Sequence, residues 1–456
     1  MIGPARIAAY EILRAVTMER ASLPAAIAAS RIGLDDDRDR ALAAEIAAGV
    51  QRWRAALDHA VEAIARRPIE RLDSEVVEIL RLSAYQLLHL TRVPAAAVVD
   101  DAVELTRRAG KRSAAGFVNA VLRSISRRRK SLPLPRRPTD LTDRAAAIEY
   151  LSVTLSHPRW LVDRWLDRFG FAGTERWLRF DNEPAPLTLR ANRFRTTRDD
   201  LASYLADHDI DVEPGRFAPD ALIVKRGPAL SMQAEGRFVV QDEASQLVAL
   251  LVGRDPGGRV LDACASPGGK TTAIAAAMGG RGVVVACDVR ERRMELLART
   301  VAATGTGNVR LVQADLTRPL PFSQPFDCVL VDAPCSGLGI LRSDPDIRWR
   351  RDEDDLPALA AAQLVMLQHS AEVVAPGGRL VYATCSSEPE ENEGVAAAFL
   401  ATTPLFRAVD LRREDTGVPL DVVDDRGHLR TYPHLHDLEA FFGAVFVRPD
   451  IRRRER

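Results

Sequence analysis

Apolar side chains recur every three or four positions through the first part of the chain, which is the spacing of helices that bury one face. They include Ile7, Tyr10, Ile12, Leu13 and Val16, and further along Val76, Ile79, Leu80, Leu82, Tyr85 and Leu88. Alanine is abundant here, and the alternation that is typical of strands is absent. The pattern predicts an all-α domain over residues 1–132, followed by a proline-rich linker from Leu132 to Pro138.

The pattern changes over residues 140–235. Helical spacing around Tyr150 and from Trp160 to Phe169 gives way to two short apolar runs, Leu187–Arg190 and Ala221–Val224. Such runs are typical of strands. We therefore expect a small α/β module in this part of the chain.

From residue 236 to about residue 450, strand-like and helical segments alternate. The predicted strands are Val260–Leu261, Val283–Ala286, Val309–Val312, Asp327–Val331 and Leu380–Thr384. Helical segments such as 290–304 and 359–374 lie between them. This alternation predicts a doubly wound, mostly parallel α/β sheet with right-handed crossovers.

Composition places the chain among globular proteins, because 46% of its residues are hydrophobic and 5% are aromatic. Lysine plus arginine equal aspartate plus glutamate at 63 each, so a nucleic-acid surface has to come from local clusters. Basic residues gather at 107–112, at 127–137 and in the tail at 452–456. Each cluster is equally compatible with a solvated face.

Five cysteines in 456 residues, with no C-x-x-C pair, exclude a disulfide framework and argue against a zinc or other metal site. No run of 18 apolar residues occurs, so no membrane span is expected. Charged residues near the start leave no apolar signal core. We expect a reduced, cytoplasmic protein that acts as a monomer.

Cys335 and Cys385 each directly follow a strand-like run. Side chains at the carboxyl ends of strands line the ligand crevice of an open α/β sheet, so both thiols face one substrate if the two strands are neighbours. A thiolate is a strong nucleophile and a good leaving group. Free cysteine is often a buried core residue, but both of these are flanked by turn residues, which favours a catalytic role.

A glycine-containing turn closes the first strand of the predicted sheet and opens a helix. Its residues are Cys264, Ala265, Ser266, Pro267, Gly268, Gly269 and Lys270. Paired glycines let the backbone approach a ligand, and a helix N-terminus offers free amides. A phosphate-binding P-loop would need glycine where Cys264 stands, and no G-x-G-x-x-G dinucleotide motif occurs.

Three acidic residues follow successive strands: Asp288, Asp315 and Asp332. An acid after the second strand accepts hydrogen bonds from ribose hydroxyls, and Asp315 is suited to an adenine amino group. Each of the three alone is equally a helix cap or a turn residue. Together with the glycine turn they indicate a nucleoside ligand without pyrophosphate, a description that S-adenosylmethionine fits.

These segments together resemble the Nop/Sun family of bacterial RNA cytosine-5 methyltransferases. The matching pieces are Ser156–Trp160, Arg190–Asn192, Val239–Leu247, Asp262–Lys270, Asp332–Gly337, Thr384–Ser386 and Glu390–Glu393. Arg81–Leu88 and Gly116–Arg123 resemble a NusB-like RNA-binding domain. The chain departs from the family pattern at Ser266, where alanine is usual, and before Phe441, where Asp-Gly is usual.

The resemblance implies a NusB-like domain at 1–132, a connecting RNA-binding module at 140–235 and a Rossmann-like methyltransferase domain at 236–450. The implied substrate is one cytosine of small-subunit (16S) ribosomal RNA, and the cofactor is S-adenosylmethionine. By resemblance, Cys385 attacks carbon 6 of the base, Cys335 assists release, and Asp332 bonds the cytosine edge. Lys270 either holds a carboxylate or is an ordinary first-turn lysine.

Three other readings stay open. Transfer RNA is a possible substrate, because the catalytic motifs do not name the RNA. A DNA cytosine-5 methyltransferase would leave Cys385 without a role, and a non-catalytic ribosome-assembly factor would not need both thiols.

Two readings also stay open for the arginines that follow the Cys335 loop, which either contact flanking phosphates or pair with acids nearby. These arginines are Arg342, Arg348, Arg350 and Arg351.

Overall fold

The computed structural model describes residues 2–253 and 257–450, so the basic tail at 452–456 lies outside the described residues. The chain forms two compact units. One consists of Met1–Pro184 together with Leu341–Arg351, and the other of Ala185–Ile340 together with Asp352–Arg456. A short stretch of the chain between the two cysteines, Leu341–Arg351, therefore belongs to the first unit.

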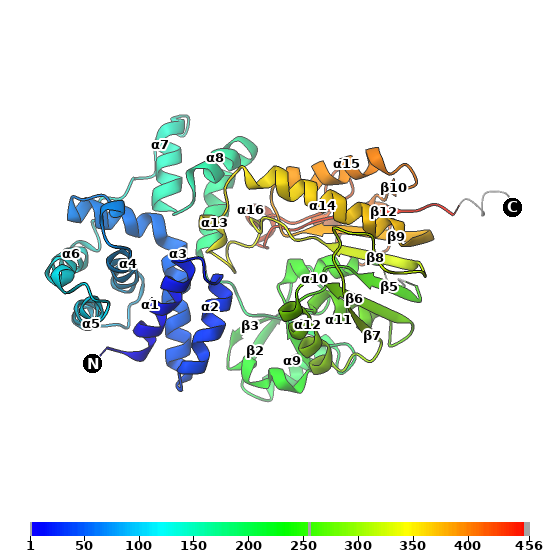
Figure 1. Cartoon of the computed structure of the whole chain (residues 1–456), viewed down its shortest axis with the longest axis horizontal. Coiled ribbons are helices and arrows are strands. Elements are labelled where there is room, and N and C mark those ends of the chain that lie inside the picture. Colours follow the sequence, from blue (N-terminus) through cyan, green and yellow to red (C-terminus); the bar gives the residue numbers. More distant parts are fainter. Residues whose placement is uncertain (1, 254–256, 451–456) are drawn as a thin grey trace. The chain divides into compact units, whose positions relative to one another are not determined.

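The first unit begins with six α-helices that enclose one apolar core (Figure 1). They are α1 (Pro4–Thr17), α2 (Leu23–Ser30), α3 (Asp37–Ala65), α4 (Ser74–His89), α5 (Ala95–Arg108) and α6 (Ala115–Arg128). Their buried stripes contain the apolar positions singled out in the sequence, for example Leu13 and Leu80. The expected all-α beginning of the chain is confirmed.

A close approach between α3 and α4 shows how specific this packing is. A Cβ atom on Gly49 would lie 1.9 Å from the ring of Tyr85, so only glycine fits at that position. The phenolic hydroxyl of Tyr85 donates a hydrogen bond of 2.5 Å to Glu45 of the same helix α3. The tyrosine thus fills the space that glycine leaves and has its polar end paired.

The first unit continues through α7 (Arg144–Glu149), a π-helical turn (Tyr150–Thr154) and α8 (Arg159–Asn182). The helix α8 is interrupted at Gly170, whose φ of 64° breaks the helical path. The side chains of Trp165 and Trp177 are fully buried, with ring centroids 4.3 Å apart. This helical stretch forms the first part of the region in which the sequence pattern predicted a small α/β module.

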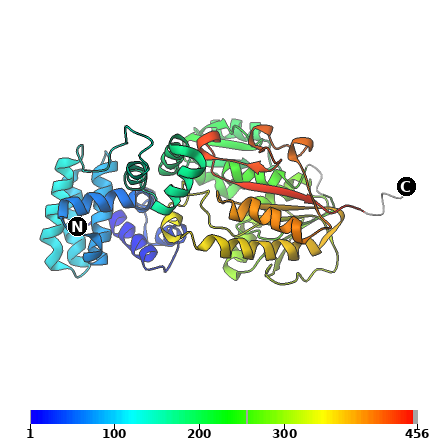
Figure 2. The same ribbon diagram turned by 90° about the horizontal axis from the view of Figure 1, so that it is seen from above.

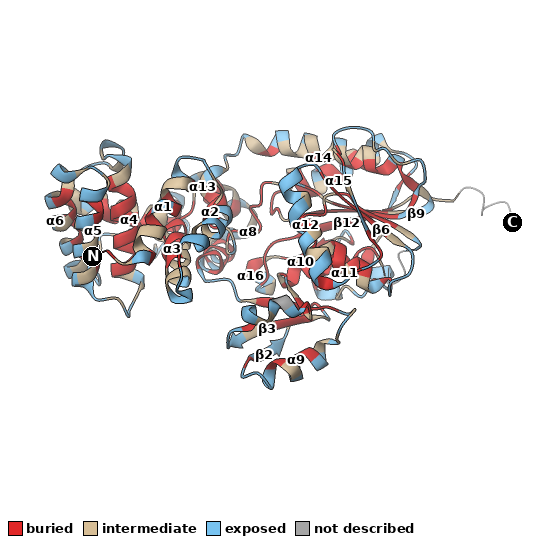
Figure 3. Ribbon diagram, turned by 60° about the horizontal axis from the view of Figure 1, so that its bottom comes forward, coloured by how far each residue is buried: buried red, intermediate tan, exposed pale blue. Residues whose placement is uncertain are grey.

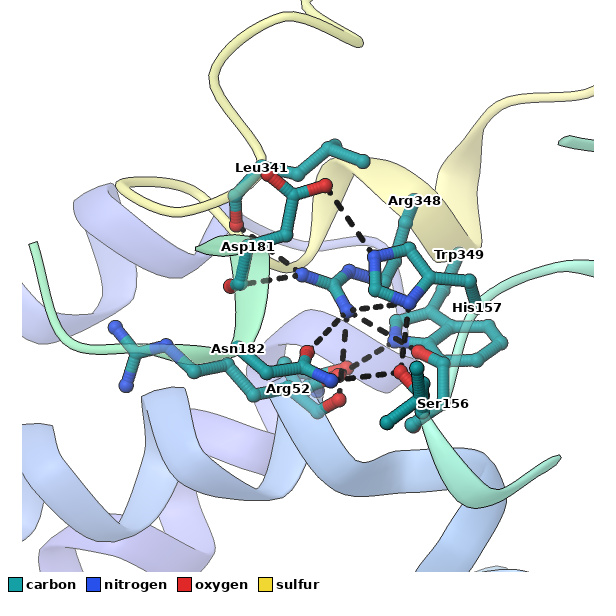
Figure 4. Close-up of polar contacts among 10 residues, drawn as sticks. Arg52, Ser156, His157, Asp181, Asn182, Leu341, Arg348 and Trp349 are labelled. Carbon is teal, nitrogen blue, oxygen red and sulfur yellow. Dashed lines mark hydrogen bonds and ion pairs between the residues drawn. The ribbon is translucent and has the colours of Figure 1, made fainter. Parts of the chain in front are cut away.

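Arg348, in the short helix α13 (Ile347–Arg350), is wholly buried among groups that accept hydrogen bonds. Its acceptors are the carbonyl oxygens of Arg52 (3.4 Å), Ser156 (3.1 Å), Asp181 (3.2 Å) and Leu341 (3.3 Å) and the side-chain oxygen of Asn182 (2.8 Å) (Figure 4). The guanidinium thus ties segment 341–351 to α3, to α8 and to the turn before α8. This arginine contacts backbone oxygens and is not available to phosphates.

Strands β1–β4 open the second unit as a separate antiparallel sheet in the order β2-β3-β1-β4. They are β1 (Thr188–Ala191), β2 (Asp211–Pro214), β3 (Ala221–Arg226) and β4 (Phe238–Val240). The helix α9 (Arg198–Ala206) packs its Leu201 and Leu205 into the core of this sheet. The two strand-like runs expected between residues 187 and 224 are both present.

The main sheet has the order β10-β12-β9-β8-β5-β6-β7, with β11 paired to β12. Its strands are β5 (Arg259–Asp262), β6 (Val283–Asp288), β7 (Val309–Gln313), β8 (Phe326–Asp332), β9 (Val374–Thr384), β10 (Arg407–Ala408), β11 (Leu429–Arg430) and β12 (Phe442–Val447). Pairings among β5 to β9 are parallel, whereas β12 runs antiparallel to β9. The doubly wound sheet expected from the alternating pattern is confirmed.

Helices cover both faces of this sheet, because successive strand residues point to opposite sides. Side chains such as Val260 and Leu330 pack against α10 (Glu243–Leu250), α11 (Gly269–Ala277) and α12 (Glu291–Thr304). Their neighbours Leu261 and Val331 pack against α14 (Asp355–Glu372) and α15 (Val395–Thr402), which run side by side in Figures 1 and 2. The central strands are accordingly buried on both faces (Figure 3).

Among the described residues, every helix is too short or too polar to span a bilayer.

We expect Arg348→Ala to lower the free energy of unfolding by about 3 kcal/mol, because several buried carbonyl oxygens lose their donor. Urea titration followed by circular dichroism measures this loss. The matched control is Arg107→Ala, which removes an exposed arginine from the same unit and should change stability little. Equal stability of Arg348→Ala and wild type would show that the guanidinium does not hold the segment in place.

The buried carboxyl of Asp181 predicts a pH dependence of stability. Burial raises its pKa from 3.8 to about 8, although the charges of Arg348 and Arg342 oppose the shift. Nε2 of the neutral His157 lies 3.3 Å from this carboxyl. Because the folded state favours the protonated acid, this contribution to stability is complete below about pH 4 and is lost as the pH rises toward 8.

Unfolding free energies of wild type and Asp181→Asn, measured at several pH values from 4.5 to 8.5, test this expectation. Wild type should lose stability relative to the variant as the pH rises, since the variant has no proton to release. Parallel curves for the two proteins would contradict it.

Candidate active site

The parallel pairing of β8 with β9 places the two cysteine loops side by side. Asp332, the last residue of β8, is in register with Ala383 near the end of β9. The pairing continues one step further, since the amide of Ala333 donates to the carbonyl oxygen of Ala383 over 2.9 Å. Cys335 and Cys385 each follow within a few residues, so the condition set by the sequence analysis, neighbouring strands, is met.

The two thiols are in direct contact. The Sγ atoms of Cys335 and Cys385 lie 3.1 Å apart, and the amide of Gly339 donates to the carbonyl oxygen of Cys385 over 2.9 Å. The hydrogen bond to Cys385, together with burial, raises the pKa of the Cys335 thiol well above its ordinary value. Cys335 therefore keeps its proton, and either sulfur can be the donor in this contact.

A partly buried ion pair lies at the same edge of the sheet. Lys270, in the first turn of α11, donates from Nζ to Oδ2 of Asp332 over 2.6 Å. Burial disfavours the charged lysine, but the charge and hydrogen bond of Asp332, with a further contribution from Cys385, outweigh it and raise the pKa of Lys270. Of the two readings of Lys270, the one in which it holds a carboxylate is the one observed.

The glycine turn lies at the carboxyl end of β5, between the ends of its two neighbouring strands. The amide of Ala263 donates to the carbonyl oxygen of Leu330 in β8, and that of Ala265 donates to Cys287 in β6, both over 2.8 Å. Gly268 has φ 106°, and a Cβ there would lie 3.0 Å from the side chain of Leu297. Only glycine allows this turn to lead directly into the N-terminus of α11.

Asp262, the last residue of β5, is buried beneath this turn. It accepts a hydrogen bond of 2.6 Å from Thr271 at Oδ2, while its buried Oδ1 has no partner in the described residues. Burial raises the pKa of this carboxyl to about 7, and the hydrogen bond from Thr271 only partly offsets it. Buried polar atoms usually have a hydrogen-bond partner, so this oxygen is a candidate contact for a polar group of a ligand.

Asp288 and Asp315 differ in burial and in the partners of their carboxylate oxygens. Asp288, at the end of β6, is buried and accepts from the amide of Ser266 over 3.3 Å, with Arg293 3.0 Å away. Asp315 is more exposed and accepts twice from Thr317 at Oδ1, which lowers its pKa. Both carboxylates serve their own turns, since Oδ1 of Asp288 accepts from the amide of Val289 over 2.9 Å, and Asp288 in addition contacts the glycine turn.

Cys264 is separate from the thiol pair. Its side chain packs at the edge of the core cluster that includes Leu261 and Val285. Burial raises the pKa of this thiol well above its ordinary value, so it stays protonated. Cys264 is suited to line the cofactor crevice and not to act as a nucleophile.

Four polar residues that the sequence analysis did not single out hold the cysteine loops. They are Ser336, Gln363, Ser386 and Glu391, all buried. Glu391 was quoted only within the Glu390–Glu393 match, and its carboxylate lies between the two loops. For Ser336 and Ser386 the signal that could have found them is that each directly follows a cysteine, whereas Gln363 lies far from both cysteines in sequence.

The basic residues divide into free and paired groups. Arg127, Arg128, Arg129 and Lys130, at the end of α6, are exposed. In contrast, Arg107 pairs with Glu104 and Lys111 with Asp73. Of the arginines behind the Cys335 loop, Arg350 pairs with Asp346 over 2.6 Å, as the second of the two readings proposed.

No group of three or more histidine, cysteine or acidic side chains in the described residues is placed to hold a metal ion.

Known families match three successive parts of the chain. The family described as 16S rRNA methyltransferase RsmB/F matches residues 249–447, and the NusB family matches residues 3–127. A ferredoxin-like domain described as RsmF/B-like matches residues 157–231. The matched ranges follow the order of the expected NusB-like, middle and methyltransferase parts.

Individual relatives are similar over nearly the whole chain. Probable ribosomal RNA small subunit methyltransferase B of Bacillus subtilis is 34% identical over 89% of this chain and 90% of its own length. Ribosomal RNA small subunit methyltransferase B of Pseudomonas putida is 35% identical over 90% and 92%. The crystal structure of PH0851 is 25% identical, with a TM-score of 0.80 over 98% of this chain and 99% of that chain. The chain belongs to the 16S rRNA methyltransferase RsmB/F family.

Proposed function

We propose that this protein transfers a methyl group from S-adenosylmethionine to carbon 5 of one cytosine in small-subunit ribosomal RNA, through a covalent bond between Cys385 and carbon 6 of the base. The observation that carries the proposal is the thiol pair, Cys335 and Cys385 at 3.1 Å, with the Lys270–Asp332 ion pair at the same sheet edge. Two adjacent thiols match a reaction in which one adds to the base and the other assists its release.

Carbon 5 of cytosine is too weak a nucleophile to take a methyl group unaided. Addition of the Cys385 thiolate forms a bond from sulfur to carbon 6. The electron pair of the carbon 5–carbon 6 double bond shifts through the ring to N3, which takes up a proton from solvent. Asp332, hydrogen-bonded to the N3/N4 edge, favours this addition, and the ring becomes an enamine that is nucleophilic at carbon 5. Covalent catalysis thus replaces one difficult step by easier ones.

The charges around the thiol pair favour Cys385 as the thiolate. Cys335 retains its proton, for the reasons given above, and its S–H can donate to a Cys385 thiolate. The nearby ammonium of Lys270 interacts favourably with the charge on Cys385. A thiolate that receives a hydrogen bond and faces a cation is stabilised, which supports Cys385 as the nucleophile.

S-adenosylmethionine supplies an electrophilic methyl carbon on a positively charged sulfur. Carbon 5 bonds to this carbon, whose bond to sulfur breaks with its electron pair remaining on sulfur. Once Cys385 is bonded to the base, it no longer raises the pKa of Cys335, so Cys335 can release its proton to solvent and take the carbon 5 proton. Loss of the N3 proton then restores the aromatic ring and expels Cys385 as a thiolate.

The residues of the crevice fit a nucleoside cofactor of this kind. The turn 264–270 presents the N-terminus of α11, and Asp288 lies at the end of β6, where ribose hydroxyls are bound in this fold. The unpartnered Oδ1 of Asp262 points to a further polar contact in the bound state. Cys264, Ser266 and Asp315 complete the proposed cofactor set.

The RNA is proposed from the relatives, whose names specify the small ribosomal subunit. The target base must be unpaired or turned out of a helix to present carbon 6 to a thiol. The exposed arginines and Lys130 at the end of α6 supply a surface for the RNA backbone. Transfer RNA is the second candidate substrate, and a non-catalytic assembly role is disfavoured because both thiols are present.

Mixing purified protein with S-adenosylmethionine and small-subunit RNA from a strain that lacks the enzyme tests the chemistry. We expect a slowly migrating protein–RNA adduct on denaturing gels with Cys335→Ala and none with Cys385→Ala, because only the former can add to the base without releasing it. Wild type should turn over and leave 5-methylcytosine, which mass spectrometry of nuclease digests detects.

Cys328→Ala is the matched control, since it removes a buried thiol of β8 that lies outside the pair and outside the cofactor set, and it should neither trap an adduct nor abolish turnover. An adduct only in Cys385→Ala would exchange the two roles. Methylation of transfer RNA alone would exchange the substrates. No adduct and no methyl transfer on any RNA would favour the non-catalytic reading.

Asp288→Asn should weaken the binding of S-adenosylmethionine by about 10-fold to 100-fold, because a charge-assisted hydrogen bond to ribose is replaced by a neutral one. Isothermal titration calorimetry without RNA measures it. Asp207→Asn, an exposed change after α9, is the control and should bind as wild type does. Unchanged affinity in Asp288→Asn would remove this residue from the proposed cofactor site.

A further inference from the structure

We propose that Glu391 is a positioning residue that holds the two cysteine loops together and orients their thiols for the successive steps of methyl transfer. The inference rests on the proposed function and adds to it a residue that does not touch the base or the cofactor. It is carried by the hydrogen bonds of one buried carboxylate to the residues that directly follow the two cysteines.

Each oxygen of Glu391 binds one cysteine loop. Oε1 accepts from the amide of Ser336 over 2.8 Å, and Ser336 directly follows Cys335. Oε2 accepts from the hydroxyl of Ser386 over 2.5 Å, and Ser386 directly follows Cys385. The two serine hydroxyls are themselves 3.1 Å apart. A single side chain thereby sets the distance between the two loops.

Further hydrogen bonds leave the carboxylate little freedom to move. Gln363 in α14 donates to Glu391 Oε1 over 2.9 Å and to the carbonyl oxygen of Pro334 over 3.0 Å. Tyr382 in β9 donates to the carbonyl oxygen of Glu391 over 2.5 Å. The backbone of Glu391 is therefore anchored to the sheet and its carboxylate to α14, which restricts the movement of the cysteine loops.

Glu391 is wholly buried, and its carboxylate forms no ion pair within residues 2–253 and 257–450. Neighbouring acids behave differently, since Glu393 pairs with Arg430 over 2.6 Å. A buried carboxylate whose side-chain partners are neutral donors keeps its negative charge largely uncompensated. That charge acts on the nearby thiols.

The charge distinguishes the two sulfurs. It contributes to raising the pKa of Cys335, after the hydrogen bond with Cys385, burial and the charge of Cys385. The ammonium of Lys270, which is paired with Asp332, interacts instead with Cys385. Glu391 thus disfavours a thiolate at Cys335.

The test compares Glu391→Gln, which keeps the shape and removes the charge, with Glu391→Ala, which removes both. We expect Glu391→Ala to lower kcat by about 10-fold or more with KM for RNA unchanged, because misplaced thiols slow the chemistry and not RNA binding. In a Cys385→Ser background, Glu391→Gln should shift alkylation of Cys335 by iodoacetamide to lower pH, since a negative charge beside the thiol is lost.

Glu390→Gln is the matched control, because it removes the same charge one position earlier in the chain. Circular dichroism and thermal unfolding identify variants that have lost the fold. Ser386→Ala, which removes the hydroxyl that joins Glu391 to the Cys385 loop, should reproduce part of the loss in kcat and keeps the test valid if Glu391→Ala does not fold.

The outcomes separate this inference from the proposed function. An adduct in Cys335→Ala combined with wild-type kcat and alkylation profile in folded Glu391 variants would overturn the role of Glu391 alone. Equal effects from Glu390→Gln would overturn it too, since the charge would then act without the specific contacts. If Cys335→Ala forms no adduct and wild type methylates no RNA, the proposed function fails, whatever the alkylation profile shows.

Discussion

The parallel pairing of β8 with β9 brings two loops that are fifty residues apart in sequence to one edge of the sheet. Parallel strands end at the same edge of a sheet, so strand pairing alone is enough to bring the two thiols that follow them together. β5 pairs with β8 on its other side and delivers the glycine turn to the same edge. The two thiols and the glycine turn lie at one edge of the sheet because of this strand order.

The backbone places the two thiols together, and the charged side chains around them then make their surroundings different. Lys270 is held by Asp332 beside Cys385, and Glu391 lies across the two loops without a cationic partner in the part of the chain that the structure describes. Two chemically identical thiols in contact share a proton, and the charge on either side biases which one keeps it. Hydrogen bonds position the sulfurs, and the electrostatics of their surroundings assigns them different tasks.

In the segment after the Cys335 loop, a buried charged side chain has a structural role. Arg348 donates hydrogen bonds to five oxygens of the helical unit. An arginine suits this role because its planar group offers donors in several fixed directions. Segment 341–351, which begins six residues beyond Cys335, is in this way anchored to the helices that precede the catalytic part of the sequence.

The sequence by itself determined the helices, the strands and their alternation, since runs such as Val283–Ala286 are apolar enough to be buried on both faces of a sheet. It also singled out Cys335, Cys385 and the glycine turn, because their chemistry is visible in residue type and spacing. The sequence did not decide the roles of Arg348 and Glu391. Arg348 was compatible with a phosphate contact or with an acidic partner, and Glu391 was visible only as part of a matching motif. Only the tertiary structure decided their partners, because a buried charge takes its role from groups distant in sequence, and local pattern carries no record of those.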